Sequence, residues 1–152
     1  MLTLQVARID EAPGTTLAQA LLDELVVRYG AEDEHDGLHP DQLAPPSGTF
    51  IVAWLDDDAV GCGGLRRIDD STGEIKRMFV AEAARRRGVA QAVLAELETT
   101  ARAVGYQRLI LETGTAQPEA IALYEADGYE SIEPYGVYKS SPLSRCYAKN
   151  LR

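Results

Sequence analysis

Apolar positions in the first third of the chain follow two different periods. Residues 2–9 alternate apolar and polar side chains, which predicts a strand. Residues 13–30 carry apolar side chains at helical spacing, and Gly30 is a typical residue at a helix end. Residues 31–48 are polar and interrupted by Gly and Pro, which indicates a loop with room for one short helical turn. A loop of this length in a compact domain is often functional.

The next segments predict an antiparallel meander. Three runs rich in apolar and β-branched residues, 49–55, 59–68 and 74–80, are separated by short turns rich in Asp, Ser and Gly. Turns this short join strands that run in opposite directions.

Two more helices and three more strands complete the pattern. Residues 87–104 present one apolar stripe at helical spacing, and Gly105 follows as a stop. Residues 106–113 form an apolar strand, 118–128 a short helix, and 129–151 two strands around a loop.

The order of these elements predicts an α/β fold in a single domain, residues 1–152. The strand, helix and strand across residues 75–113 imply a parallel pair with a right-handed crossover, whereas the meander is antiparallel. We therefore expect a mixed, mostly antiparallel sheet with one parallel pair and helices on both faces.

Composition narrows the class of protein. With 45% hydrophobic and 26% charged residues the chain has the balance of a soluble globular protein. The net charge of -9 argues against a broad surface for nucleic acid or anionic membranes. No apolar run approaches the roughly 20 residues of a membrane span, and the N-terminus lacks the pattern of a signal peptide, so we expect a cytoplasmic protein.

Cysteine and histidine offer little chemistry in this sequence. Cys62 and Cys146 are too few for a disulfide framework, and reduced thiols are favoured over one bridge. His35 and His39 are four residues apart, but Gly37 lies between them and the motif lacks the Glu of a zinc protease helix. No metal site is predicted.

Positive charge gathers at the start of the helix predicted over 87–104. Arg85, Arg86 and Arg87 lie where the helix dipole disfavours cations, unless an anion binds among them. Gly88 would let a ligand approach the backbone amides of the helix start, so a polyanion such as a pyrophosphate fits this turn. The alternative is a solvated charge run paired with acids such as Glu82.

Two motifs resemble those of the GNAT superfamily of acyl-coenzyme A N-acyltransferases. "EIKRMFVAEAARRRGVAQAVLAELE" contains Arg-x-x-Gly-x-Ala after a strand that ends in Val, like the coenzyme motif of that superfamily. "AIALYEADGYESI" is similar to its second marker, Ala-x-x-Leu-Tyr-x-x-x-Gly-Phe/Tyr, at the expected separation. The order of elements also matches along nearly the whole chain, and the fold and activity of the superfamily follow as expectations.

The resemblance implies acetyl-CoA as the acyl donor and assigns residues to it. The strand before the motif would pair with the pantetheine arm, the helix start would hold the pyrophosphate, and a backbone N–H of that strand could polarise the thioester carbonyl. Gln117 matches an Asn that contacts the coenzyme in many members. The implied coenzyme residues are Met78, Phe79, Val80, Arg85, Arg86, Arg87, Gly88, Val89, Ala90, Gln117 and Tyr124.

The resemblance also suggests the residues that move protons. Tyr124 matches the usual acid, since a phenol with a reference pKa near 10 can protonate the departing thiolate. The alternative is a tyrosine that only packs inside the helix. Glu74 aligns with the general base of some members, with an ordinary strand-end residue as the alternative, and Glu112 is a second candidate.

The acceptor side is expected along the 31–48 loop and the late hairpin. Its candidate residues are Tyr29, Arg66, Glu112, Tyr135 and Tyr138. We expect N-acetyl transfer to a primary amine of a small molecule by direct attack. Many members of the superfamily are homodimers, so the resemblance also suggests a homodimer. The alternatives are a peptide or protein amine as acceptor, or a non-catalytic sensor that binds acyl-CoA.

Overall fold

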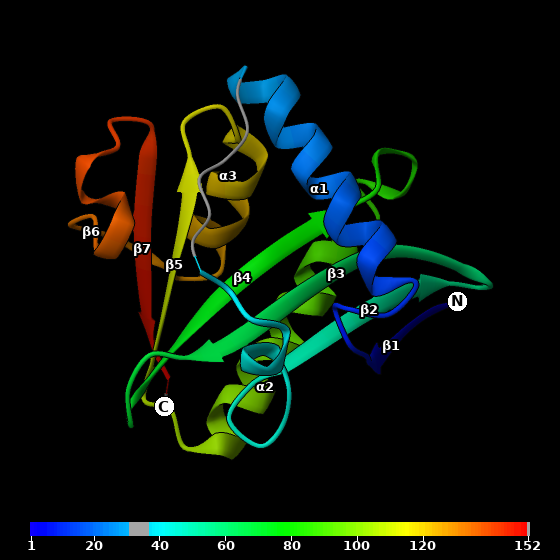
Figure 1. The fold of residues 1–152 in the computed structure, drawn as a ribbon, viewed down its shortest axis with the longest axis horizontal. Helices are drawn as coiled ribbons and strands as arrows, with labels where there is room; N and C mark the ends of the chain where they lie inside the picture. Colours follow the sequence, from blue (N-terminus) through cyan, green and yellow to red (C-terminus); the bar gives the residue numbers. More distant parts are fainter. Residues whose placement is uncertain (31–36, 152) are drawn as a thin grey trace.

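The computed structural model describes residues 1–30 and 37–151, which form one mixed sheet with helices packed against it (Figure 1). The sheet has seven strands in the order β1-β2-β3-β4-β5-β7-β6. The strands are β1 (Leu2–Val6), β2 (Thr49–Leu55), β3 (Asp58–Arg67), β4 (Thr72–Val80), β5 (Arg108–Gly114), β6 (Glu130–Ile132) and β7 (Ser144–Asn150). The helices are α1 (Gly14–Tyr29), α2 (Val89–Val104) and α3 (Pro118–Ala126), with short 3-10 helices η1 (Pro40–Leu43), η2 (Glu82–Ala84) and η3 (Gly136–Ser140).

Both faces of the sheet are covered, as the sequence predicts. Successive residues of β2 are buried on opposite sides, because side chains alternate along a strand. Phe50 and Val52 pack with Leu17 of α1. Ile51 and Ala53 belong to the larger core beneath α2 and α3. In Figure 1, α1 accordingly lies on one face of the sheet and α2 on the other.

The expected parallel pair forms only over its first part. β4 and β5 pair from Thr72 opposite Arg108 to Ile75 opposite Leu111. Beyond these residues β4 pairs with β3 alone and β5 with β7 alone. Figure 1 shows the two strands diverging toward their C-terminal ends. The edge of β4 that faces β5 is therefore without a strand partner from Lys76 onward.

A β-bulge bends β4 at the same point. Gly64 of β3 pairs with Lys76, but Cys62 pairs with Phe79, so β4 has one residue more than β3 between them. Arg77 lies in this bulge with a φ of 60°. An extra residue of this kind increases twist and changes the direction of the following side chains.

Two boundaries differ from the sequence prediction. β1 ends at Val6 rather than residue 9, and Arg8 instead binds Asp10 and Asp41 on a turn. α2 begins at Val89 because Gly88 adopts a φ of 77°, outside the helical region. The short helical turn allowed within the 31–48 loop is η1, while residues 31–36 lie outside the described part.

The described residues contain two cysteines and no candidate membrane span. Cys62 and Cys146 are both buried and are not bonded to each other. None of the described helices is both long enough and apolar enough to cross a membrane.

Candidate active site

The turn before α2 has the backbone geometry of an anion site. Arg86 and Gly88 both adopt positive φ angles, 66° and 77°, which curl the chain into the helix start. The first amides of a helix have no acceptor within the helix, and no side chain caps those of α2. These N–H groups and the helix dipole together favour a phosphate at this turn.

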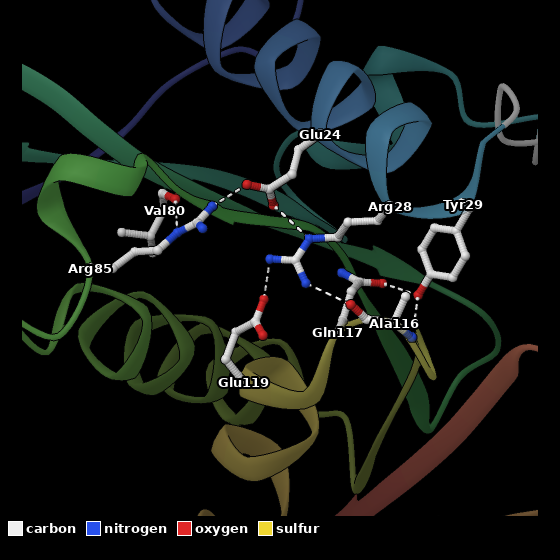
Figure 2. Close-up of polar contacts among 8 residues, drawn as sticks. All are labelled: Glu24, Arg28, Tyr29, Val80, Arg85, Ala116, Gln117 and Glu119. Carbon is white, nitrogen blue, oxygen red and sulfur yellow. Dashed lines mark hydrogen bonds and ion pairs between the residues drawn. The ribbon is translucent and has the colours of Figure 1, made fainter.

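The three arginines of the turn point in different directions. Arg85 faces α1, since its Nε donates to the Val80 carbonyl at 3.0 Å and its guanidinium pairs with Glu24 (Figure 2). Arg86 is exposed and lines the adjacent cavity. Arg87 is exposed but is not among the lining residues. The predicted cluster is therefore divided: Arg85 and Arg86 both line the cavity, with Arg85 paired to α1, while Arg87 lies on the surface.

A cavity of about 810 Å³ occupies the space where β4 and β5 diverge. The C-terminal half of α1, the start of α2 and the inner side of α3 enclose it. Most residues that the sequence assigns to the coenzyme line this cavity, namely Met78, Phe79, Val80, Arg85, Arg86, Gly88, Val89, Ala90, Gln117 and Tyr124.

Tyr124 reaches the cavity from α3. It is only 4% exposed, and its ring packs edge-on against Tyr129 with centroids 5.7 Å apart. No hydrogen bond to its hydroxyl is found among the described residues. Burial, and secondarily the negative charge of Glu112, raises the pKa of Tyr124 above its ordinary value. The phenol therefore keeps its proton at neutral pH and has it available for a ligand.

Thr113 is a cavity residue that the sequence analysis does not identify. It lies on β5 beyond the last residue paired with β4, and it is 5% exposed. Its Oγ1 is buried without a hydrogen-bond partner in the described residues. Such an atom costs free energy unless a ligand or water satisfies it. Threonine is common in strands, so the sequence carries no signal that separates this one from a packing residue.

Glu74 lies behind the cavity rather than along its wall. The side chain is 1% exposed, with Oε1 accepting from Arg66 Nε at 2.7 Å and Oε2 from the Tyr135 hydroxyl at 2.6 Å. Burial and the adjacent carboxylate raise the pKa of Tyr135. None of these three predicted residues lines the cavity. The contacts instead join β3, β4 and the segment that leads into η3.

A second polar group does face the cavity on the side of β5 and η3. Glu112, Tyr138 and Lys76 all line it. Lys76 is only 7% exposed, and its ammonium group donates to the Tyr138 hydroxyl at 2.8 Å. Burial raises the pKa of Tyr138, although Lys76 opposes the shift. The structure thus brings together two predicted acceptor residues and a lysine that sequence reasoning missed.

The other candidate residues lie elsewhere. Tyr29 is not a lining residue, and its hydroxyl instead bonds to Gln117 (Figure 2). His39 Nδ1 accepts from the Asp41 amide at 3.2 Å and so caps η1, whereas His35 is outside the described residues. Across residues 1–30 and 37–151, no three His, Cys, Asp or Glu side chains gather as metal ligands would.

Comparisons with known proteins identify the family of the chain. Residues 14–129 match the model of the acetyltransferase (GNAT) family. The chain is 35% identical over 149 residues to the uncharacterized N-acetyltransferase YsnE of Bacillus subtilis. The alignment covers 95% of this chain and 98% of that protein. It is 40% identical over 124 residues to the IAA acetyltransferase of Azospirillum brasilense, covering 81% and 80% of the two chains.

Solved structures share the whole fold. A Klebsiella pneumoniae protein, provisionally described as an acyl-CoA N-acyltransferase, aligns with a TM-score of 0.84 at 30% identity over 100% of this chain and 99% of its own. A GNAT acetyltransferase of Elizabethkingia anophelis with acetyl-CoA bound aligns at a TM-score of 0.71 and 20% identity over 99% and 98% of the two chains. Fold, family match and full-length relatives agree, and the chain therefore belongs to the GNAT family as an acetyl-CoA-dependent N-acetyltransferase.

Proposed function

We propose that this enzyme transfers the acetyl group of acetyl-CoA to the primary amine of a small molecule by direct attack. The observation that carries the proposal is the cavity at the divergence of β4 and β5. It joins an uncapped helix start, an unpaired strand edge and a buried phenol within one space. A phosphate-bearing thioester needs these three features in this order: an anion site, backbone groups along its arm and an acid near its sulfur.

For coenzyme binding, the residues present fit the ligand. The amides of Gly88, Val89 and Ala90 with the Arg86 guanidinium would hold the pyrophosphate. The free edge of β4 from Met78 to Val80 would pair with the amides of the arm. The Thr113 hydroxyl would find the hydrogen-bond partner that the described protein does not give it.

In the proposed chemistry, the neutral amine attacks the thioester carbonyl, and the C–N bond forms as the C–S bond breaks. The amine gives up a proton, and Tyr124 donates one to the sulfur as it leaves. Burial raises the pKa of Tyr124 well above the thiol reference value of about 8.5, so the phenol stays protonated at neutral pH and donates its hydrogen bond, and then its proton, as negative charge develops on the sulfur. No covalent intermediate on the protein is required.

Glu112 is the better placed of the two candidate bases. It lines the cavity and is close enough to influence the pKa of Tyr124, whereas both oxygens of Glu74 bind other side chains behind the wall. We therefore assign proton removal to Glu112, directly or through water, and give Glu74 a supporting position.

The acceptor is tested with a panel of small primary amines, followed by the release of free thiol. IAA is tested beside the amines, as a separate compound, because a relative 40% identical to this chain is named IAA acetyltransferase. With an amine that turns over, Tyr124→Phe should lower kcat by about 10²-fold or more and leave the Kd for coenzyme A unchanged. If Tyr124→Phe weakens coenzyme binding instead, the ring is structural. If the unmodified chain binds the coenzyme but acetylates no amine, the proposal of catalysis on small amines is wrong.

The two carboxylates are separated by the pH dependence of kcat/KM. Glu112→Gln should lower kcat by about 10²-fold and remove the acidic limb of the profile, because an amide cannot accept the proton. Glu74→Gln keeps the shape and one acceptor oxygen, so it should retain that limb. The opposite result, with the limb lost only in Glu74→Gln, would return the base role to Glu74.

A further inference from the structure

The last turn of α1 is fastened to the segment that precedes α3. Arg28 Nη1 donates to the Ala116 carbonyl at 2.7 Å, and the same guanidinium pairs with Glu119. Arg28 also lies near Glu24, with Nε 3.7 Å from Oε2, and Glu24 in turn pairs with Arg85. Figure 2 shows these contacts running from the turn before α2, across α1, to the start of α3.

Tyr29 adds a contact that is aimed at one functional side chain. Its hydroxyl donates to Gln117 Oε1 at 3.1 Å and accepts from the Ala116 amide at 3.2 Å. Gly114 makes this approach feasible, since a Cβ at that position would overlap the Tyr29 hydroxyl. The tyrosine, the turn and the glycine therefore form one fitted arrangement rather than a surface contact.

The contact fixes the orientation of the Gln117 amide. Because Tyr29 holds the amide oxygen, the amide nitrogen points away from it (Figure 2). Gln117 is itself a lining residue. An amide nitrogen is a donor, and the two amides of a pantetheine arm offer carbonyl acceptors. A rotated Gln117 would instead present an acceptor oxygen to those carbonyls.

We propose that Tyr29 is a positioning residue for the coenzyme, which acts by fixing the Gln117 amide as a donor into the cavity. Arg28 supports it by holding the same turn through Ala116 and Glu119. The inference rests on the proposed coenzyme site. Under this proposal α1, which covers the face of the sheet opposite α2, also contributes to the affinity for the coenzyme.

A double-mutant cycle on coenzyme A binding, measured by calorimetry, tests this inference. Tyr29→Phe keeps the ring over Gly114 and removes the hydroxyl, and it should weaken binding about 3- to 10-fold, the range of one hydrogen bond. Gln117→Ala should weaken binding similarly. In the Gln117→Ala background, Tyr29→Phe should have no further effect, because the residue through which it acts is gone.

Two controls make the result specific. Tyr147→Phe removes a hydroxyl that also bonds to α3, at Glu125 Oε2 and 3.0 Å, and it should leave affinity unchanged. Gln117→Glu keeps an acceptor for Tyr29 but replaces the donor nitrogen, so it should bind as weakly as Gln117→Ala. Thermal unfolding and near-UV circular dichroism confirm that each variant is folded.

Several outcomes would overturn the inference. Unchanged affinity in Tyr29→Phe, an equal loss in both backgrounds, or full affinity in Gln117→Glu would each show that Tyr29 does not act through a donor at Gln117. Failure of the proposed function is recognised separately, since the unmodified chain would then not bind coenzyme A at all.

Discussion

At the scale of single residues, Thr113 gives the sharpest evidence that the cavity is built for a ligand. A buried hydroxyl without a protein partner destabilises a protein unless a ligand or a water satisfies it, and this one lies on the cavity wall. Thr113→Val is nearly isosteric and removes only that group. We expect the free energy of unfolding to stay the same or rise by about 1 kcal/mol, while coenzyme A binds about 3- to 10-fold more weakly.

The two measurements are urea unfolding without ligand and calorimetric titration with coenzyme A. Thr99→Val serves as the control, because Thr99 Oγ1 bonds within α2 to the Ala95 carbonyl and the residue is exposed. A destabilised Thr113→Val with normal affinity would show that the hydroxyl serves the fold, through a water for example, and not the ligand.

At the scale of elements, the sequence predicts the sheet well because its signals are local. The run of apolar and β-branched residues along 49–55 and the helical stripe along 87–104 are contained in short stretches of the chain, and both elements form as expected. The parallel pair follows from the handedness of the crossover. Its early end at Ile75 does not, since it depends on the bulge at Arg77 and on packing from both faces.

The same distinction explains which site residues the sequence could identify. Gly88 and Tyr124 belong to contiguous motifs, and both line the cavity. Lys76 and Thr113 look like ordinary strand residues in the sequence. They line the cavity only because β4 and β5 separate beside them. Arg85 is the converse case: the motif suggests a phosphate contact and the residue does line the cavity, but its guanidinium pairs with Glu24 of α1. Long-range contacts of this kind leave no periodic signal in one sequence.

At the scale of the whole molecule, the net charge of the chain is negative, whereas the proposed coenzyme site is positive. The chain carries a net charge of -9, so its overall field repels a polyanionic coenzyme. At the proposed coenzyme site the attraction would act at short range, through the helix start and Arg86. Added salt screens the long-range repulsion more than it screens contacts made inside a cavity. This arrangement favours one bound anion at a defined turn over general adhesion to polyanions.

Buried tyrosines make global stability depend on pH in the alkaline range. Burial raises the pKa of Tyr129, and Glu98, which accepts its hydroxyl proton at 2.8 Å, raises it further. Below a pH of about 10 the tyrosine is protonated in both the folded and the unfolded chain, and its contribution to stability is fully present. Above that pH the unfolded chain loses the proton first, so the free energy of unfolding falls by up to about 1.4 kcal/mol per pH unit for each such group.

Tyr129→Phe separates the contribution of Tyr129 from those of other groups that titrate in the same pH range. Burial also raises the pKa of Cys62 to about 12, which gives a decline of the same sign that begins lower, near the ordinary thiol pKa of about 8.5. That decline is common to both proteins and cancels in their difference. At neutral pH the variant should be less stable, because it loses a buried hydrogen bond and leaves Glu98 with one partner fewer. Its urea midpoint should then fall less steeply above a pH of about 10 than that of the unmodified chain, so the two curves converge. Parallel curves would mean that Tyr129 ionises as easily folded as unfolded, which would contradict its burial against Glu98.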